Sequence, residues 1–296
     1  MAKNLLDKAT DTVPGFGQMY AKFRQYMLLL QRSEDTIRSY SYRFAHICIR
    51  FSKLPDDLTG DQLNDYLEYL LEEDQSHSRS YFKQVVYAIK MYYRFRDIPV
   101  PPGLVLPKIK EENKLPVVLS FDEMRDLLRK NDDLRVKTIL AMLYSCGMRQ
   151  SELRRLKLDD IDFARNLVYI KQAKGGKPRC VELGQNMRKV LLKYMSVYQP
   201  KEYVFTLEYT GMPIGKHAMS GIIKIATEKA GLTKHITPHT LRHTYATHLL
   251  EMGVSLYRLK ELMGHASITA TMVYLHIIKP IDGVSFSPID RLFPVR

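Results

Sequence analysis

Apolar side chains recur at every third or fourth position in two separate blocks of the chain, which is the pattern of helices with one buried face. In the first block this spacing predicts four helices, over residues 17–30, 34–51, 61–71 and 79–96. The second of them carries an aromatic and aliphatic stripe, made of Tyr40, Phe44, Ile47 and Phe51. Because that recurrence is what burial requires, we expect the stripe to be core, and the block to be a helical domain.

The second block mixes helical periodicity with two short β-type runs. Ser120 and Glu123 form a capping-box pattern that predicts a helix start. The helices expected here cover residues 121–130, 134–145, 151–156, 185–197, 217–230, 238–252, 256–262 and 268–277. Residues 166–170 and 179–183 read as strands joined by a turn at Gly175 and Gly176. The sequence therefore predicts a mainly α fold with a small antiparallel β-sheet.

A charged, proline-rich segment over residues 98–116 separates the two blocks. A chain of 296 residues is long enough to bury two modest cores. We therefore expect a helical domain over residues 1–100, a linker over 101–116, and a second domain with a C-terminal tail over 117–296.

The chain is basic, with a formal charge of +13 and an isoelectric point near 9.5, and residues 111–296 carry +10 of that charge. Such a balance favours a polyanionic partner, of which nucleic acid is the commonest. In the first block, six basic residues are expected to be exposed and available for phosphate contacts: Arg38, Arg43, Lys83, Lys90, Arg94 and Arg96.

The three cysteines and the N-terminus carry no targeting or cross-linking signal. Cys48, Cys146 and Cys180 are unevenly spaced in apolar contexts without a C-x-x-C pair, so we expect reduced core thiols and neither a disulfide framework nor a zinc knuckle. No apolar run reaches the length of a signal-peptide core at the N-terminus or of a membrane span elsewhere. We expect a cytoplasmic protein without a membrane partner.

The segment over residues 237–253 can be placed closely on one helix. Thr237 suits the N-cap, Pro238 suits the first helical position, and Gly253 follows the last turn. His239 and Arg242 share the N-terminal face, where backbone N–H groups favour an anion such as phosphate. His239 and His243 have the spacing of a zinc-binding helix, but Thr240 stands in place of the glutamate base, so we expect no metal. His243 and His248 are interpreted as packing or surface residues.

Three blocks together resemble the tyrosine recombinases, the phage integrase and Xer group: LYSCGMRQSELRRLKLDDID, then YIKQAKGGKPRCVEL, then TPHTLRHTYATHLLEMGVSLYRLKELMGHASITATMVYLH. The first block resembles the family's helical core-binding domain in its helix pattern and in Ser33, Thr36 and Tyr40. All six of the family's catalytic positions match in type, order and spacing, and the resemblance places them on Arg149, Lys174, His239, Arg242, His265 and Tyr274.

The resemblance implies a site-specific DNA recombinase built as a C-shaped clamp, acting in integration, excision or resolution. Tyr274 would form a covalent 3′-phosphotyrosyl intermediate without metal, ATP or another cofactor. The two arginines would clamp the phosphate, His239 and His265 would donate hydrogen bonds, and Lys174 would protonate the leaving oxygen. His239 is also expected to accept the tyrosine proton. The partners implied are double-stranded DNA and, on synapsed DNA, three further copies in a homotetramer, with a monomer expected when free.

Two other classes stay open at this point. Residues 239–263 have helix-turn-helix spacing across Gly253, which would suit a DNA-binding regulator that does not cut. A type IB topoisomerase would use related chemistry as a monomer. We further expect Ile268, Met272 and Leu275 to form a buried seam from which Tyr274 projects, and the C-terminal tail to dock on a neighbouring protomer.

Overall fold

A computed structural model describes residues 4–72, 78–108, 115–171, 178–207 and 210–276. The chain divides into two compact units, Met1–Glu112 and Asn113–Arg296. The division falls inside the proline-rich segment between the two periodic blocks. Each unit is described by itself.

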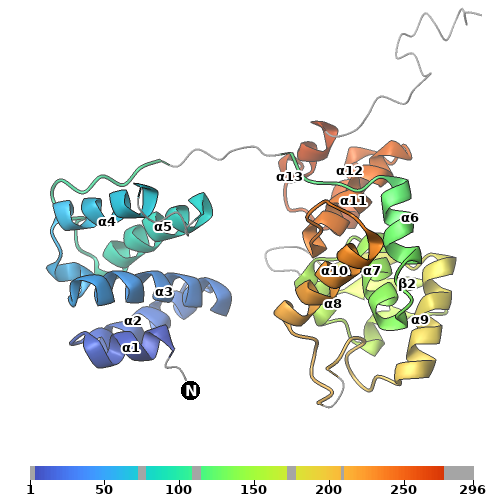
Figure 1. Ribbon diagram of the computed structural model, residues 1–296, viewed down its shortest axis with the longest axis horizontal. Coiled ribbons are helices and arrows are strands. Elements are labelled where there is room, and N and C mark those ends of the chain that lie inside the picture. The colour runs from blue at the N-terminus through green and yellow to red at the C-terminus, as the bar shows by residue number, and fades with distance from the viewer. Residues whose placement is uncertain (1–3, 73–77, 109–114, 172–177, 208–209, 277–296) are drawn as a thin grey trace, which may run out of the picture. The chain divides into compact units, whose positions relative to one another are not determined.

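In its described residues, 4–72 and 78–108, the first unit contains helices and no strand (Figure 1). Its helices are α1 (Leu5–Thr12), α2 (Phe16–Leu29), α3 (Glu34–Phe51), α4 (Gly60–Glu72) and α5 (Arg79–Arg96), with a 3-10 turn η1 (Pro55–Asp57). The Ser33 side chain accepts a hydrogen bond from the backbone N–H of Thr36, which explains why α3 starts where the sequence predicted. Phe44 and Ile47 are buried, and the ring of Phe44 packs edge-on against Phe23. The predicted stripe on α3 is therefore core along its centre.

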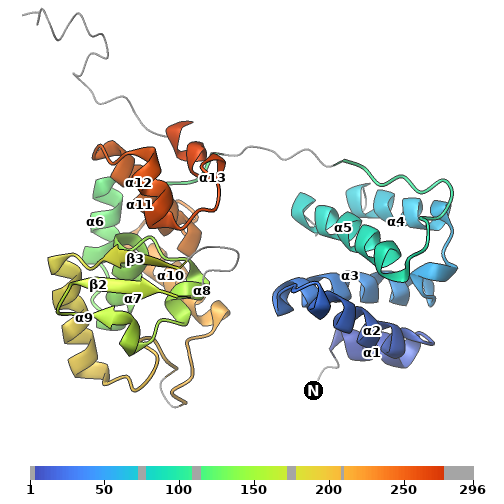
Figure 2. The same ribbon diagram turned by 180° about the vertical axis from the view of Figure 1, so that it is seen from behind.

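The second unit combines a three-stranded antiparallel sheet with helices beside and behind it, and its fold class is as predicted (Figure 2). The strands are β1 (Ile161–Asp162), β2 (Leu167–Ile170) and β3 (Arg179–Glu182), in the order β1-β2-β3. The helices are α6 (Phe121–Arg129), α7 (Leu134–Ser145), α8 (Gln150–Arg154), α9 (Gln185–Tyr198), α10 (Lys216–Ala230), α11 (Pro238–Glu251), α12 (Leu256–Met263) and α13 (Thr269–Met272), with 3-10 turns η2 (Leu158–Asp160) and η3 (Val273–His276).

The helix α11 lies at the centre of this unit, and its buried residues are spread around its whole circumference. It packs against α7, α12 and η3. The buried side chains of this helix, such as Arg242, are therefore held in fixed directions by packing, whereas His239 is exposed. This is the element on which the sequence placed two candidate residues, His239 and Arg242.

Three residues, Cys180, Arg43 and Lys83, differ from the expected exposure. Cys48 and Cys146 are buried, but Cys180 is exposed, because side chains alternate along β3 and those of Arg179 and Val181 take the inward places. Arg43 is half-buried, because its guanidinium stacks on the Tyr81 ring and donates to Gln84 at 2.8 Å.

Lys83 is also half-buried, whereas Arg38, Lys90, Arg94 and Arg96 are exposed as expected. Among the described helices, none is long and apolar enough to cross a membrane.

Candidate active site

Three side chains of the candidate site come from the first two turns of α11: His239, Arg242 and His243. The N-terminus of this helix is fixed as the sequence predicted, since Thr237 accepts a hydrogen bond from the N–H of Thr240 at 3.1 Å and Pro238 takes the first helical position. The helix therefore delivers these side chains from a defined, capped end.

Arg242 is buried and ties together three segments of the second unit. Its Nη1 donates to the backbone oxygen of Gly147, and its Nη2 donates to that of Met263 at 2.6 Å. The same Nη2 lies 3.1 Å from Nε2 of His265. Since an arginine can only donate, Nε2 of His265 must be the acceptor. The guanidinium is therefore held beside His265 and bonded to the main chain just ahead of Arg149.

Arg149 is the N-cap residue of α8 and is oriented by Glu152. The Glu152 carboxylate accepts the backbone N–H of Arg149 at 2.7 Å and its Nη1 at 2.8 Å. Glu152 therefore orients Arg149. The Nη1 group of Arg149 is fixed by Glu152, while a quarter of the side chain stays exposed.

A third arginine, Arg179, completes this cluster, and no sequence motif pointed to it. Its Nη1 and Nη2 donate to the two oxygens of Glu152 at 2.9 and 2.7 Å, a bidentate pair with the arginine only 5% exposed and the carboxylate fully buried. Burial alone would raise the pKa of Glu152, but the hydrogen bonds and charge of Arg179, with those of Arg149, lower it to about 2. Glu152 is therefore an anion that holds two cations in place.

His265 follows Gly264, which ends α12 with a φ of +60°. A side chain at Gly264 would also meet Cδ of Arg179 at 3.0 Å, so glycine is needed here for both backbone and space. With Nε2 facing Arg242, the ring donates through Nδ1 to Thr271 at 2.9 Å. Burial and the nearby Arg242 lower the pKa of His265 to about 4, so its ring is neutral near pH 7.

Tyr274 lies on η3 with its ring 2% exposed, packed with Tyr245, Leu259 and Met263. Its hydroxyl is 3.0 Å from Nδ1 of His243, and its ring runs nearly parallel to that of His265, with 6.5 Å between centroids. Burial raises the pKa of the phenol, while Arg242 and Arg149 counteract it. The hydroxyl is therefore protonated near pH 7.

The expectation for the segment around Tyr274 is wrong in one respect. Met272 and Leu275 are 46% and 45% exposed and form no buried seam, whereas Tyr274 itself is buried. The reason is local, because α13 ends at Met272 and the chain continues as the tighter turn η3. A 3-10 turn advances by a different angle per residue, so the helical register used for the prediction does not extend to Tyr274.

Of the two histidines that were interpreted as packing or surface residues, only His248 has that role. It is hydrogen-bonded to the Tyr144 hydroxyl at 2.8 Å and to the Leu119 backbone oxygen at 2.9 Å. His243 instead contacts Tyr274 and lies one turn after His239, with 6.5 Å between the two rings. The spacing of four residues from His239 was the signal that could have indicated it.

Lys174 lies outside the described residues, between β2 and β3, whose paired ends are Ile170 and Arg179. The other five predicted residues, Arg149, His239, Arg242, His265 and Tyr274, come together around α11. His239 is exposed, and partial desolvation of its ring, followed by the charges of Arg242, Arg149 and Lys216, lowers its pKa. Two arginines and neutral histidines beside a phenol can bind a tetrahedral oxyanion next to a nucleophile.

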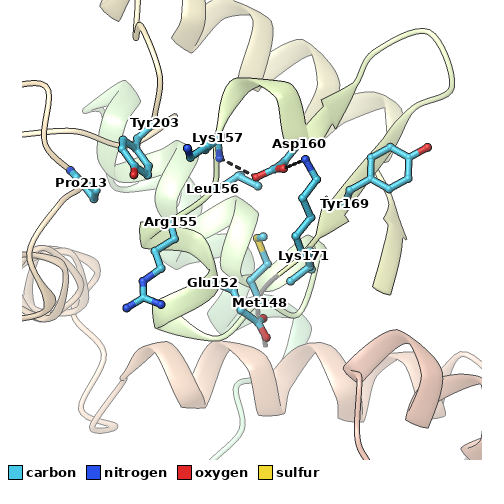
Figure 3. A pocket seen from close by; sticks show the side chains of 11 residues that line it. Met148, Glu152, Arg155, Leu156, Lys157, Asp160, Tyr169, Lys171, Tyr203 and Pro213 are labelled. Atoms are coloured by element: carbon cyan, nitrogen blue, oxygen red, sulfur yellow. Dashed lines mark hydrogen bonds and ion pairs between the residues drawn. The ribbon is translucent and has the colours of Figure 1, made fainter. Parts of the chain in front are cut away.

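In the described part of the chain no group of three or more His, Cys, Asp or Glu side chains is placed to hold a metal ion. A cavity of about 530 Å³ opens beside Met148 and Glu152, and two of its lysines form ion pairs, Lys171 with Asp160 at 2.6 Å and Lys157 with Glu202 at 2.8 Å (Figure 3). The cluster of Arg149, Arg179 and Arg242 gathers three guanidinium groups around the single carboxylate of Glu152, so it is the better candidate for anion chemistry.

In the first unit, basic residues of α5 gather on one side of the helix. Lys83, Lys90 and Arg94 are spaced by seven and four residues and therefore share a face, which Tyr87 also joins. Arg38 lies on α3, where its guanidinium is 5.4 Å from the centre of the Tyr42 ring. A basic face with aromatic residues suits a nucleic-acid backbone.

Comparison with known proteins shows the family to which the chain belongs. The sequence pattern of the phage integrase family matches residues 117–279. Tyrosine recombinase XerA of Pyrococcus horikoshii is 30% identical over 86% of this chain and 88% of its own length. Tyrosine recombinase XerD of Listeria innocua is 30% identical over 83% of this chain and 89% of its own length.

Solved structures give the same result. A crystal structure of XerA recombinase is 27% identical and covers 94% of this chain and 97% of its own, with a TM-score of 0.52. A lambda integrase dimer bound to a core site shares the fold, with a TM-score of 0.71 at 18% identity over 92% of this chain and 99% of its own. The chain belongs to the phage integrase family of tyrosine recombinases, enzymes that cleave and rejoin DNA at specific sites.

Proposed function

We propose that this recombinase attacks a DNA phosphodiester with the hydroxyl of Tyr274 and holds the strand as a 3′-phosphotyrosyl intermediate. The observation that carries the proposal is that the Tyr274 ring lies parallel to that of His265, which contacts the buried Arg242 of the same chain, while its hydroxyl contacts His243, the residue after Arg242. A protomer with this geometry needs no residue from a neighbour to supply the nucleophile. We therefore expect cleavage in cis.

The remaining predicted residues have roles that follow from their charges. Arg149 and Arg242 bind the non-bridging oxygens, on which negative charge develops as the tyrosine attacks, and His239 and His265 donate further hydrogen bonds. For His265 to donate through Nε2, Arg242 turns to the phosphate and the ring proton moves from Nδ1 to Nε2, so that Nδ1 accepts from the Thr271 hydroxyl. Lys174 gives a proton to the departing 5′-oxygen. The bond energy stays in the phosphotyrosyl link, so attack by a 5′-hydroxyl reseals the strand without ATP, metal or another cofactor.

Two cleavages on each of two duplexes require four active sites, so we propose that four protomers assemble on synapsed double-stranded DNA and that the free protein is a monomer. Related proteins have been solved on DNA, including a XerH recombinase with its difH substrate and the lambda integrase dimer at its core site. We propose the first unit as the core-binding domain and the second as the catalytic domain. The predicted docking of the C-terminal tail on a neighbour concerns residues outside the described ones.

The test is covalent capture followed by mapping. The full chain is expressed in cells, the lysate is denatured rapidly, and protein-linked DNA is purified and sequenced. After nuclease and protease digestion, mass spectrometry locates the nucleotide on a peptide. We expect the nucleotide on Tyr274 and DNA ends that share a sequence. A nucleotide on another residue would reject Tyr274 as the nucleophile, and no linked DNA at all would favour a regulator that binds without cutting.

DNA binding should depend steeply on salt, because each phosphate contact releases condensed counterions. Replacing Lys90 or Arg94 with glutamine should reduce the slope of log affinity against log salt by about 1 for each phosphate that is no longer neutralised. Arg24, which pairs with Glu34 at 2.8 Å on another helix, is the matched control, and its change to glutamine should leave the slope unchanged. Fluorescence anisotropy with the captured DNA sequence gives the affinity at each salt concentration. If the slope of log affinity against log salt were the same for all three variants, Lys90 and Arg94 would not contact the DNA phosphates.

A further inference from the structure

We propose that His243 is the general base that takes the proton from Tyr274 during DNA cleavage. The inference rests on the proposed role of Tyr274 and assigns one step within it. The observation behind it is direct contact, since Nδ1 of His243 lies 3.0 Å from the phenol oxygen. Among the described side chains, this is the hydrogen bond that the structure records for that hydroxyl.

Tyr274 must lose its proton to attack phosphorus, so it needs a base beside its hydroxyl, where His243 lies. Burial raises the pKa of Tyr274, so its hydroxyl keeps its proton near pH 7 despite the charges of Arg242 and Arg149. A general base must lie within hydrogen-bond reach of the proton that it abstracts, which His243 does. The proton must leave as the oxygen attacks phosphorus.

His243 is also in the right protonation state to accept. Burial, followed by the charges of His239 and Arg242, lowers its pKa to about 4, so the ring is neutral near pH 7. With its proton on Nε2, the ring offers the lone pair of Nδ1 to Tyr274. The ionisable groups that face it are His239 and Arg242 on α11, His265 after α12, and Tyr274 on η3.

Binding of DNA improves this base. A phosphodiester held between Arg149 and Arg242 adds a negative charge near the cationic group that depresses the His243 pKa. The pKa of His243 then rises toward the ordinary histidine value, and its proton affinity increases at the time of attack. The free enzyme thus keeps a weak base, and the DNA complex has a stronger one.

The step balances without any further reactant. The O–H bond of Tyr274 breaks as its proton goes to Nδ1 of His243, and the tyrosine oxygen forms a bond to phosphorus. The bond between phosphorus and the 5′-oxygen breaks, and that oxygen takes a proton from Lys174. In the resealing reaction His243 returns its proton to the departing tyrosine oxygen.

His239, to which the resemblance assigned this proton, is placed for another task. It is exposed, it lies three residues before Arg242 on the same face of α11, and the positive charges that lower its pKa, after desolvation, are those of Arg242, Arg149 and Lys216. A hydrogen-bond donor to a phosphate oxygen suits that position. His239 and His243 therefore divide between them the two roles of binding phosphate and accepting a proton.

The experiment compares His243→Asn with wild type in single-turnover cleavage of a nicked suicide duplex that carries the captured DNA sequence. The asparagine oxygen takes the place of Nδ1 and keeps the contact, but it cannot take up a proton. We expect cleavage at pH 7 to fall by a factor on the order of 10² to 10⁴. The rate of the variant should then rise about tenfold per pH unit between roughly pH 7 and 9, because hydroxide must remove the proton before attack.

His248→Asn is the matched control, because His248 is on the same helix and also bonds a tyrosine hydroxyl, that of Tyr144. It should lower stability and leave the pH profile of cleavage as in wild type. Incorporating 3,5-difluorotyrosine at position 274 acidifies the phenol and should restore the rate of His243→Asn by a larger factor than it changes that of wild type.

Two results would overturn the inference. The first is a cleavage experiment in which His243→Asn keeps the rate and pH profile of wild type, or in which His239→Asn shows the hydroxide-dependent profile instead. The second is nitrogen NMR of the full wild-type chain. If it finds the His243 proton on Nδ1, that atom cannot accept the proton of Tyr274. If Tyr274→Phe still formed a covalent adduct, Tyr274 would not be the nucleophile. If Tyr274→Phe formed no adduct but His243→Asn cleaved at the wild-type rate, Tyr274 would remain the nucleophile and only the role of His243 as the base would be rejected.

Discussion

Replacing Tyr274 with phenylalanine is expected to abolish covalent capture of DNA, with a loss in cleavage rate on the order of 10⁴-fold to 10⁶-fold, as for removal of a nucleophile in other enzymes. The change removes one oxygen and keeps the ring among Tyr245, Leu259 and Met263, so the fold should be unchanged. Loss of the hydrogen bond to His243 should cost about 1 kcal/mol of the free energy of unfolding. Denaturing electrophoresis of the suicide-duplex reaction gives the rate, and anisotropy gives the affinity, which should stay near that of wild type.

Tyr245→Phe provides the matched control for this prediction. Tyr245 is buried in the same cluster, and burial raises its pKa to about 12, so it is a comparable phenol without a base in contact among the described side chains. Its removal should leave the cleavage rate within a few fold of wild type. An adduct in Tyr274→Phe, or its loss in Tyr245→Phe, would place the nucleophile elsewhere.

Replacing Glu152 with glutamine should lower the free energy of unfolding by about 3–5 kcal/mol, because removing one partner of a buried ion pair leaves the other charge uncompensated. The charge left behind is that of Arg179, which is 5% exposed and bonded twice to the carboxylate. Urea denaturation followed by circular dichroism gives the free energy of unfolding.

Glu123→Gln is the control for the same chemical change. Glu123 occupies the same N3 position in the capping box of α6, but its pair with Lys234 is partly exposed, so the loss should stay at or below about 1 kcal/mol. Equal losses for Glu123→Gln and Glu152→Gln would mean that the buried cluster around Glu152 adds no stability of its own.

The pH dependence of wild-type stability gives a second measurement of the same cluster. The pKa of Glu152 is lowered in the folded protein from an ordinary value of 4.5 to about 2, so its contribution is fully present above about pH 4.5 and is lost as the pH falls toward 2. That contribution is about 3 kcal/mol at neutral pH. The stability difference between wild type and Glu152→Gln should therefore narrow below pH 4.5; a constant difference would contradict the ionised state.

The helices that sequence predicts to the residue are those with local signals at both ends. Caps and apolar period together define α3, α5 and α7, because N-caps and periodic faces are properties of neighbouring residues. In contrast, the sequence did not predict α1 or β1. These elements have eight and two residues, which are too few for a hydrophobic period to be visible. The register error at Tyr274 has the same origin, since nothing local indicates the change from α13 to η3.

In the candidate site, too, some residues could be predicted from the sequence and others only from the folded structure. The family motifs place Arg149, His239, Arg242, His265 and Tyr274 by spacing along the chain, and α11 brings their elements together. Arg179 and His243 depend on contacts between elements, one from β3 to α8 and one from α11 to η3. An arginine in a four-residue strand gives no sign that it faces inward, so only the folded structure reveals it as the partner of Glu152.

The three hydrogen bonds of Arg242 bear on how an inert version of this enzyme should be made. Because the guanidinium holds the main chain at Gly147 and at Met263, a change there removes architecture together with reactivity. A reagent intended to occupy and mark a recombination site without cutting it should keep Arg242 and carry the single substitution Tyr274→Phe. Such a protein would report where the enzyme binds in a genome while leaving every strand intact.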